Sequence, residues 1–283
     1  MPARLPILIL SLSLSISVLF GEGAPPATVL KDIAYTGGAN PQQTLDLYLP
    51  AQKPAPLVLW IHGGGWKTNN KSWVLVPYLV AKGYAIASIN YRYSTEAIFP
   101  AQIQDANAAL NFVLHHAAEY GLDKNRIAVA GDSAGGHLAL LLGLARDEGG
   151  FGADATIRPR AVIDFFGPTD FTAFSQPPPP GAEDVIGQLL GATPHDRPDL
   201  AKAASPVTYV AAANPPVLIL HGEKDTVVPL SQSRVLEDLL KKANIPAELV
   251  VVPGGGHEGP AFSNAKAQEK ILRFLEQNLG PQS

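Results

Sequence analysis

Short apolar runs rich in Val, Ile and Leu recur along the chain, and most are followed by a stretch with helical periodicity. Six of these runs are almost continuously apolar, which is typical of strands buried on both faces of a parallel sheet. An alternating segment and the run before it, joined across Gly37 and Gly38, predict an antiparallel pair at one edge of the sheet. The predicted strands are residues 29–35, 44–49, 57–61, 85–89, 127–130, 161–165, 217–220 and 249–252.

Apolar residues spaced three and four apart predict helices over residues 101–120, 134–146, 231–243 and 265–279. Alternating strands and helices are typical of an α/β protein, here a three-layer sandwich with a mostly parallel eight-stranded sheet. Two segments fall outside this pattern. Residues 147–158 are rich in Gly and not periodic, and residues 171–206 contain four consecutive prolines. We interpret the second segment as a small insertion with a short helix near residues 183–190.

The N-terminal segment has the pattern of a secretory signal peptide. Arg4 precedes an apolar stretch over residues 5–20, and small residues follow it at positions 21, 23 and 24. The stretch is shorter than the roughly 20 residues that usually span a membrane. We therefore expect a signal peptide over residues 1–23, a single mature domain over residues 24–283, export to the periplasm or the extracellular space, and no stable membrane insertion after cleavage. A retained membrane anchor is the alternative.

Composition narrows the classes of function. The chain is 46% hydrophobic and 16% charged, which is typical of a folded domain and not of a disordered one. Its 21 Lys and Arg residues and 25 Asp and Glu residues are dispersed, so no basic run predicts nucleic-acid binding. The chain has no cysteine, which excludes disulfides, thiolate metal sites and cysteine nucleophiles. Any catalytic nucleophile must therefore be another side chain.

Residues 131–135, Gly-Asp-Ser-Ala-Gly, lie directly between a predicted strand and a predicted helix. A sharp strand-to-helix turn forces unusual backbone angles on Ser133 and leaves no room for side chains on its neighbours, which is why glycine stands two residues before and two after. Such a turn exposes one hydroxyl group. The pattern therefore predicts that Ser133 is a nucleophile.

A second motif, His-Gly-Gly-Gly-Trp at residues 62–66, follows the predicted strand 57–61. Acyl transfer through a serine creates a tetrahedral oxyanion, which must be met by preorganised donors, and consecutive glycines let backbone N–H groups approach a substrate oxygen. We predict that the N–H groups of Gly64, Gly65 and Ala134 are these donors. His62 is interpreted as a residue that orders the loop, and a plain flexible turn is the alternative reading of the motif.

A serine nucleophile needs a base and an orienting carboxylate, which follow it along such a chain in the order acid, then histidine. His257 stands on a loop after the last predicted strand and is the predicted base. Asp225 follows the penultimate strand and is the predicted acid, with Glu223 and the more distant Asp170 as alternatives. The remaining histidines are interpreted as packing, capping or surface residues: His137, His195, His221 and the adjacent pair His115 and His116.

Five motifs in this order resemble the α/β-hydrolase superfamily and, within it, the bacterial feruloyl-esterase-like (BD-FAE) group, near the hormone-sensitive-lipase-like esterases. They lie at residues 62–66, 90–105, 131–137, 225–229 and 255–257. The resemblance implies an α/β-hydrolase fold, a catalytic triad of Ser133, Asp225 and His257, and an oxyanion hole at Gly64, Gly65 and Ala134. The chain departs from the lipase side at residues 93–96, where Tyr-Ser-Thr-Glu replaces the usual Leu-Ala-Pro-Glu, and it lacks the long N-terminal cap of that branch.

These features predict a serine carboxylesterase that acts, without metal or organic cofactor, on a small-molecule or polysaccharide-linked ester with a short-chain or aromatic acyl group. Trp66 and Tyr93 are the predicted substrate-binding residues, Phe166 lies either in the pocket or in the core, and the insertion over residues 171–206 is expected above the site. Exopeptidases of the prolyl-oligopeptidase type and arylformamidases share this fold and triad. A non-catalytic binding protein would be expected to lose the Ser, the His or the glycine loop. The sequence leaves the acyl group and the oligomeric state open.

Overall fold

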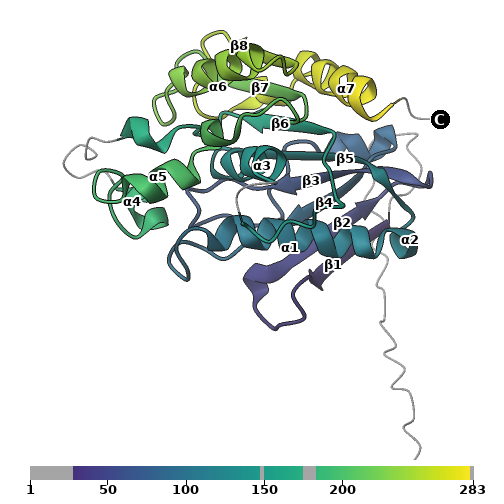
Figure 1. Ribbon diagram of the computed structural model, residues 1–283. Coiled ribbons are helices and arrows are strands. Elements are labelled where there is room, and N and C mark those ends of the chain that lie inside the picture. Colours follow the sequence, from purple (N-terminus) through teal and green to yellow (C-terminus); the bar gives the residue numbers. More distant parts are fainter. Residues whose placement is uncertain (1–27, 147–149, 175–182, 281–283) are drawn as a thin grey trace, which may run out of the picture.

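A computed structural model describes residues 28–146, 150–174 and 183–280, so the predicted signal peptide and the four consecutive prolines lie outside the described residues. An eight-stranded sheet runs through the molecule in the order β1-β2-β4-β3-β5-β6-β7-β8 (Figure 1). The pairs β1–β2 and β2–β4 are antiparallel, and all pairs from β4 to β8 are parallel. The predicted α/β fold with a mostly parallel sheet is confirmed.

The strands are β1 (Thr28–Ala34), β2 (Thr44–Leu49), β3 (Ala55–Ile61), β4 (Ala85–Ile89), β5 (Leu122–Asp132), β6 (Ala161–Phe165), β7 (Val217–Gly222) and β8 (Ala247–Val252). The α-helices are α1 (Ala101–His115), α2 (Ala117–Tyr120), α3 (Ala134–Leu144), α4 (Val185–Leu190), α5 (Pro198–Ala204), α6 (Ser231–Lys242) and α7 (Ala265–Leu279). Short 3-10 turns lie at η1 (Pro41–Gln43), η2 (Pro77–Lys82), η3 (Phe171–Phe174), η4 (Pro206–Tyr209) and η5 (Pro260–Phe262).

The sheet separates the core into two apolar clusters because successive side chains of a strand point to opposite faces. One cluster packs the sheet against α1, α3 and α6, and the other packs it against η2 and α7. Figure 1 shows α1 and α3 side by side across the strands. Among the described residues, no helix is both long enough and apolar enough to cross a membrane.

Two details differ from the sequence prediction. The helix expected over residues 101–120 is broken at His116, which leaves helical geometry at φ −99° while its Nδ1 atom contacts the Phe112 carbonyl oxygen at 2.8 Å. The strand expected over residues 249–252 is only half-buried, with exposed Glu248 before it, because β8 is the edge strand of the sheet and pairs with β7 alone.

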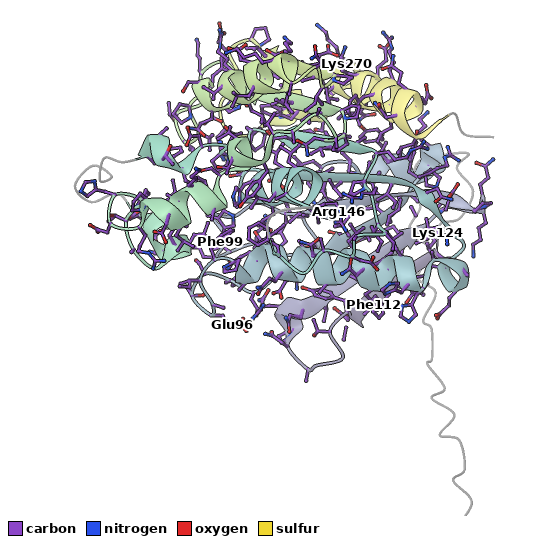
Figure 2. The ribbon with its side chains drawn as sticks, viewed as in Figure 1. Glu96, Phe99, Phe112, Lys124, Arg146 and Lys270 are labelled. Atoms are coloured by element: carbon purple, nitrogen blue, oxygen red, sulfur yellow. The ribbon has the colours of Figure 1, made fainter. Side chains whose placement is uncertain are left out.

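The described part of the insertion packs beside the glycine loop that follows β3. Lys67 on this loop forms an ion pair with Glu183, and the Phe99 N–H donates to the Leu189 carbonyl oxygen at 2.8 Å. A Cβ atom built on Gly65 would lie 3.6 Å from the side chain of Val185. In Figure 2, Phe99 points inward, whereas Glu96 and Lys124 lie at the periphery. These contacts place α4 against the loop that carries the predicted oxyanion donors.

One buried carboxylate in the sheet has a hydrogen-bond partner on only one of its two oxygen atoms among the described residues. Asp164 in β6 is fully buried, and its Oδ1 atom accepts the Gly167 N–H at 3.0 Å. Its Oδ2 atom has no hydrogen-bond partner among the described residues. Burial raises the pKa of Asp164 to about 7, against a smaller lowering by nearby His221 and by the Gly167 amide. The folded state therefore prefers the protonated acid.

This preference predicts a stability change with pH. The pKa of Asp164 is higher in the folded state than in the unfolded state. The contribution of its protonated form to the free energy of unfolding is therefore complete below about pH 4 and is lost as pH rises through about 7. Asp164→Asn keeps the acceptor for Gly167 and removes the titration. We expect its free energy of unfolding, relative to the parent, to improve by about 2 kcal/mol between pH 5 and pH 8. Urea unfolding at the two pH values measures this, and an equal difference at both would contradict the assignment.

Candidate active site

The turn between β5 and α3 holds Ser133 in a strained backbone conformation, with φ 52° and ψ −117°. Its N–H donates to the Phe165 carbonyl oxygen at 2.8 Å, and its carbonyl oxygen accepts the His137 N–H at 3.0 Å. A Cβ atom on Gly131 would lie 2.4 Å from the Gly135 carbonyl oxygen, so both glycines are required for the turn to close. The turn presents the Ser133 hydroxyl at the carboxyl edge of the sheet.

The structure brings together the three side chains that the sequence singled out. His257 follows β8, and its Nε2 atom lies 2.8 Å from Ser133 Oγ. Its Nδ1 atom lies 2.8 Å from Oδ2 of Asp225, which follows β7. In this geometry the imidazole can take the Ser133 proton at Nε2 while Asp225 accepts the Nδ1–H bond and holds the ring in that tautomer.

The carboxylate of Asp225 is held on both oxygens. Its Oδ1 atom accepts the N–H groups of Val227 and Val228 at 2.8 and 2.9 Å, and its side chain has no exposed surface. Burial alone would raise the pKa of Asp225, but hydrogen bonds from His221 and His257 and from the Val228 amide outweigh it and hold the pKa well below its usual range. Asp225 is therefore ionised wherever His257 can act as a base.

His221 contacts the same carboxylate oxygen of Asp225 that His257 contacts. Its Nε2 atom lies 3.2 Å from Asp225 Oδ2 and 2.8 Å from the Val228 carbonyl oxygen, and its Nδ1 atom lies 2.6 Å from Ser233 Oγ. All of this histidine is buried. With Nε2–H as the donor, Ser233 donates its hydroxyl proton to Nδ1. The interpretation of His221 as a packing or capping residue missed this contact, which its position four residues before Asp225 at a strand end could have indicated.

The glycine loop supplies backbone N–H groups beside the serine turn. Gly64 and Gly65 have φ values of 109° and 59°, and a Cβ atom on Gly64 would lie 2.3 Å from the Thr68 carbonyl oxygen. Within the described residues, neither glycine N–H donates a hydrogen bond to the protein. Ala134 opens α3, where N–H groups lack intrahelical partners. The Gly63 N–H donates to Asp132 Oδ1 at 2.9 Å, which ties this loop to the residue before Ser133.

The two predicted substrate-binding residues differ in exposure. Trp66 is only 3% exposed, its indole N–H donates to His137 Nδ1 at 3.2 Å, and its ring lies 5.7 Å from that of Phe171. The Trp66 indole therefore packs in the core under the glycine loop and offers almost no surface to a ligand. Tyr93 is half-buried and donates its hydroxyl to the Asn69 carbonyl oxygen. Phe166 is buried, with its ring 4.8 Å from the His257 ring.

His137 shows how a buried histidine near the site remains neutral. Because Nδ1 accepts the Trp66 N–H, Nε2 carries the proton and donates to the Ala204 carbonyl oxygen at 2.7 Å. Burial lowers the pKa of His137 to about 4, and the same cause lowers that of His62, whose ring stacks on Tyr91. Within the described part of the chain, neither imidazole ring forms a hydrogen bond with Ser133, in agreement with the interpretation of His62 and His137 as ordering and packing residues.

The other candidates have local roles. Glu223 accepts the Gly254 N–H at 2.8 Å, and Asp170 accepts both the N–H and the hydroxyl of Thr172. His195 is exposed, and His115 lies 3.1 Å from Asp154. No cluster of three or more His, Asp or Glu residues that could hold a metal ion occurs within residues 28–146, 150–174 and 183–280.

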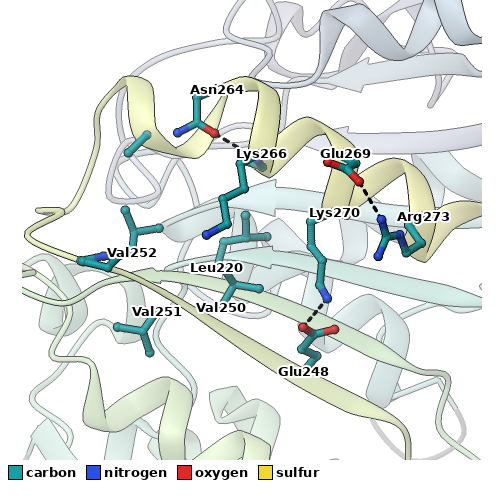
Figure 3. Close-up of a pocket in the computed structure, with 13 residues that line it drawn as sticks. Leu220, Glu248, Val250, Val251, Val252, Asn264, Lys266, Glu269, Lys270 and Arg273 are labelled. Carbon is teal, nitrogen blue, oxygen red and sulfur yellow. Dashed lines mark hydrogen bonds and ion pairs between the residues drawn. The ribbon is translucent and has the colours of Figure 1, made fainter.

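A hollow of about 340 Å³ lies between β8 and α7, away from the triad side chains (Figure 3). Its floor includes Leu220, Val250 and Val252, and its rim carries ion pairs between Lys270 and Glu248 and between Arg273 and Glu269. None of its lining residues is Ser133, Asp225 or His257. Among the described residues, none that line this hollow makes a hydrogen bond or ring contact with a triad side chain, which separates it from the candidate active site.

The fold is an α/β-hydrolase fold. A serine lies on a strained turn after a central parallel strand, and a glycine loop faces it. A His and an Asp from the ends of the last two strands complete the arrangement. The BD-FAE family model matches residues 45–240. The chain therefore belongs to the BD-FAE family.

Individual relatives are named as esterases. Esterase LipC of Mycobacterium tuberculosis is 31% identical, over 85% of this chain and 63% of LipC. A truncated carbohydrate esterase from gut microbiota is 32% identical with a TM-score of 0.81, covering 89% of this chain and 96% of that one. A thermophilic esterase from Thermogutta terrifontis is 28% identical with a TM-score of 0.72, covering 91% and 95%. The chain thus spans less than two thirds of the curated Mycobacterium tuberculosis relatives.

The contact between His221 and Asp225 generates a prediction about a positioning residue. His221→Phe removes the Nε2–H group that bonds to the Val228 carbonyl oxygen and lies 3.2 Å from the buried Asp225 carboxylate. We expect kcat for ester hydrolysis to fall about 10- to 100-fold with little change in KM. His221→Gln can place an amide N–H near the position of Nε2 and should recover most of the loss. If His221 serves packing alone, Phe will be tolerated at least as well as Gln. Steady-state kinetics of both variants, with folding checked by circular dichroism, decides between the two roles.

Proposed function

We propose that the chain is a serine carboxylic ester hydrolase with Ser133 as nucleophile, His257 as base and Asp225 as the orienting acid. The observation that carries this proposal is the continuous hydrogen-bonded line from Ser133 Oγ through both ring nitrogens of His257 to Asp225. Membership of a family with named esterases among its relatives supports it.

The residues allow a two-step reaction. Ser133 Oγ attacks the ester carbonyl carbon as its proton passes to His257 Nε2, and Asp225 stabilises the resulting imidazolium. The N–H groups of the predicted oxyanion hole receive the negative oxygen, and the alcohol leaves with the proton from Nε2. Water then gives its proton to Nε2 and attacks the acyl-enzyme. The acid leaves as Ser133 recovers its proton.

The proposed substrates are short-chain or aromatic acyl esters, either small or linked to a carbohydrate. A carbohydrate esterase is among the structural relatives, and the Thermogutta terrifontis esterase has structures with bound propionate and with bound butyrate. These ligands and this activity belong to the relatives. For this chain they support a small acyl group and a sugar-linked alcohol.

The first test is hydrolysis by the full chain of p-nitrophenyl acetate, p-nitrophenyl butyrate and methyl ferulate. We expect turnover by the parent and a fall in kcat on the order of 10³-fold or more for Ser133→Ala, because the attacking atom is lost. Ser231→Ala, at an exposed serine that begins α6, is the matched control and should retain activity. A folded parent that is inactive on all three esters but cleaves an aminoacyl or formyl amide would shift the assignment to a peptidase or an arylformamidase.

Export is the second part of the proposal, and it rests on the apolar stretch over residues 5–20. Expression of the full gene in a bacterial host and N-terminal sequencing of the protein in the periplasm or medium tests it. We expect a new N-terminus after Gly21 or Gly23. Recovery of the protein in the cytoplasmic or membrane fraction with Met1 intact would contradict export by a cleaved signal peptide.

A further inference from the structure

A cavity of about 410 Å³, which we name the side pocket, adjoins the candidate active site. Its walls are sequence neighbours of the triad: Asp132 precedes Ser133, and Glu258 follows His257. Phe166, which also lines it, contacts the His257 ring at a centroid distance of 4.8 Å. The side pocket therefore adjoins the triad through the chain neighbours of Ser133 and His257 and through the ring contact between Phe166 and His257.

Trp73 forms the exposed wall of this pocket. It is 40% exposed, yet its indole N–H donates to Asp132 Oδ2 at 3.3 Å, which fixes the ring in place. The floor is made by Phe166 and Phe262, which are almost fully buried and pack edge to face. Trp73 is therefore the aromatic side chain that presents a flat apolar surface to a ligand ring, and Phe166 and Phe262 close the pocket behind it with almost no exposed surface.

The polar groups of the side pocket are mainly acceptors. The carboxylate of Glu258 is exposed and makes no hydrogen bond or ion pair with the described residues. No residue that lines the pocket is Lys or Arg. A carboxylate accepts hydrogen bonds only, so the pocket suits a ligand that carries hydrogen-bond donors on an apolar frame.

The two carboxylates of the side pocket differ in how far they are already engaged. Both carboxylate oxygens of Asp132 already accept N–H groups, from Gly63 and from Trp73. Burial raises the pKa of Asp132 to about 6, opposed by these hydrogen bonds and assisted by Glu258. The one uncommitted carboxylate, Glu258, faces solvent, where salt screens its charge. Glu258 therefore offers its carboxylate oxygens as acceptors to a hydroxyl group of a ligand ring that lies on Trp73.

We propose that the side pocket binds the leaving alcohol of the ester, and that this alcohol is a sugar ring stacked on Trp73 with a hydroxyl donating to Glu258. The inference rests on the proposed serine esterase function and extends it to the alcohol side. It also predicts that a bound sugar can replace water. Its hydroxyl oxygen attacks the acyl-enzyme carbonyl and gives its proton to His257 Nε2, and Ser133 Oγ leaves with that proton as the new ester forms.

Competition between water and added alcohols measures this binding. The full chain is given p-nitrophenyl acetate as acyl donor with methyl β-D-xylopyranoside, 1-propanol or choline as acceptor, and the acetylated products are quantified by chromatography. We expect transfer to the glycoside to saturate with its concentration and to exceed transfer to the other two alcohols at equal concentration. Saturation requires a binding site, whereas random collision gives a linear dependence.

Variants assign the binding to the side pocket. Trp73→Ala and Glu258→Gln should each lower the ratio of transfer to hydrolysis about tenfold, as expected for the loss of one stacking or hydrogen-bonding contact. Trp73→Phe keeps an aromatic face and should keep most of the ratio. Val235→Ala and Glu276→Gln, at exposed positions on α6 and α7 outside the pocket, are the matched controls and should change neither rate.

The outcomes separate the two proposals. Release of p-nitrophenol without saturable transfer to the glycoside would overturn the sugar site and leave the esterase assignment standing. Preferred transfer to choline, or a ratio unchanged in both Trp73→Ala and Glu258→Gln, would also overturn it. A folded parent that releases no p-nitrophenol would overturn the esterase proposal and, with it, the inference that depends on it.

Discussion

The candidate site depends on the close approach of the first turn of α3 to the ends of β3 and β5. A Cβ atom on Gly135 would lie 2.0 Å from the Ile61 carbonyl oxygen, so any larger residue would push the helix away from the sheet. This approach requires a positive φ at Ser133, which is a strained conformation. The surrounding hydrogen bonds hold the residue in that conformation. It also brings the start of α3, whose first N–H groups lack intrahelical partners, close to the beginning of the glycine loop.

Polar contacts join the separate loops of the site into one unit. Asp132 holds the glycine loop through Gly63 and fixes Trp73, so one carboxylate positions both the predicted oxyanion donors and the wall of the side pocket. Both His221 and His257 contact Oδ2 of Asp225. Since these groups are buried or half-buried, each loss would leave an unpaired polar group, which is the costly outcome in a protein interior.

The sequence predicted the sheet and the side chains that meet at its edge, because apolar strands are short and continuous and the chemistry-bearing residues follow them directly. It failed where the answer depends on contacts between distant segments. The burial of Trp66 against His137 and Phe171, and the half-burial of the edge strand β8, follow from packing that no local pattern encodes. The contact of His221 with Ser233 was not predicted, because Ser233 lies on the following helix.

The central claim is that the strained Ser133 is the activated nucleophile. Reaction of the folded full chain with diethyl p-nitrophenyl phosphate, followed by intact mass and peptide mapping, tests it most directly. The account predicts one added diethylphosphoryl group, located on Ser133, and loss of labelling in His257→Gln because the hydroxyl then has no base. Labelling at a different residue, or rapid labelling of Ser133 that does not depend on His257, would contradict it.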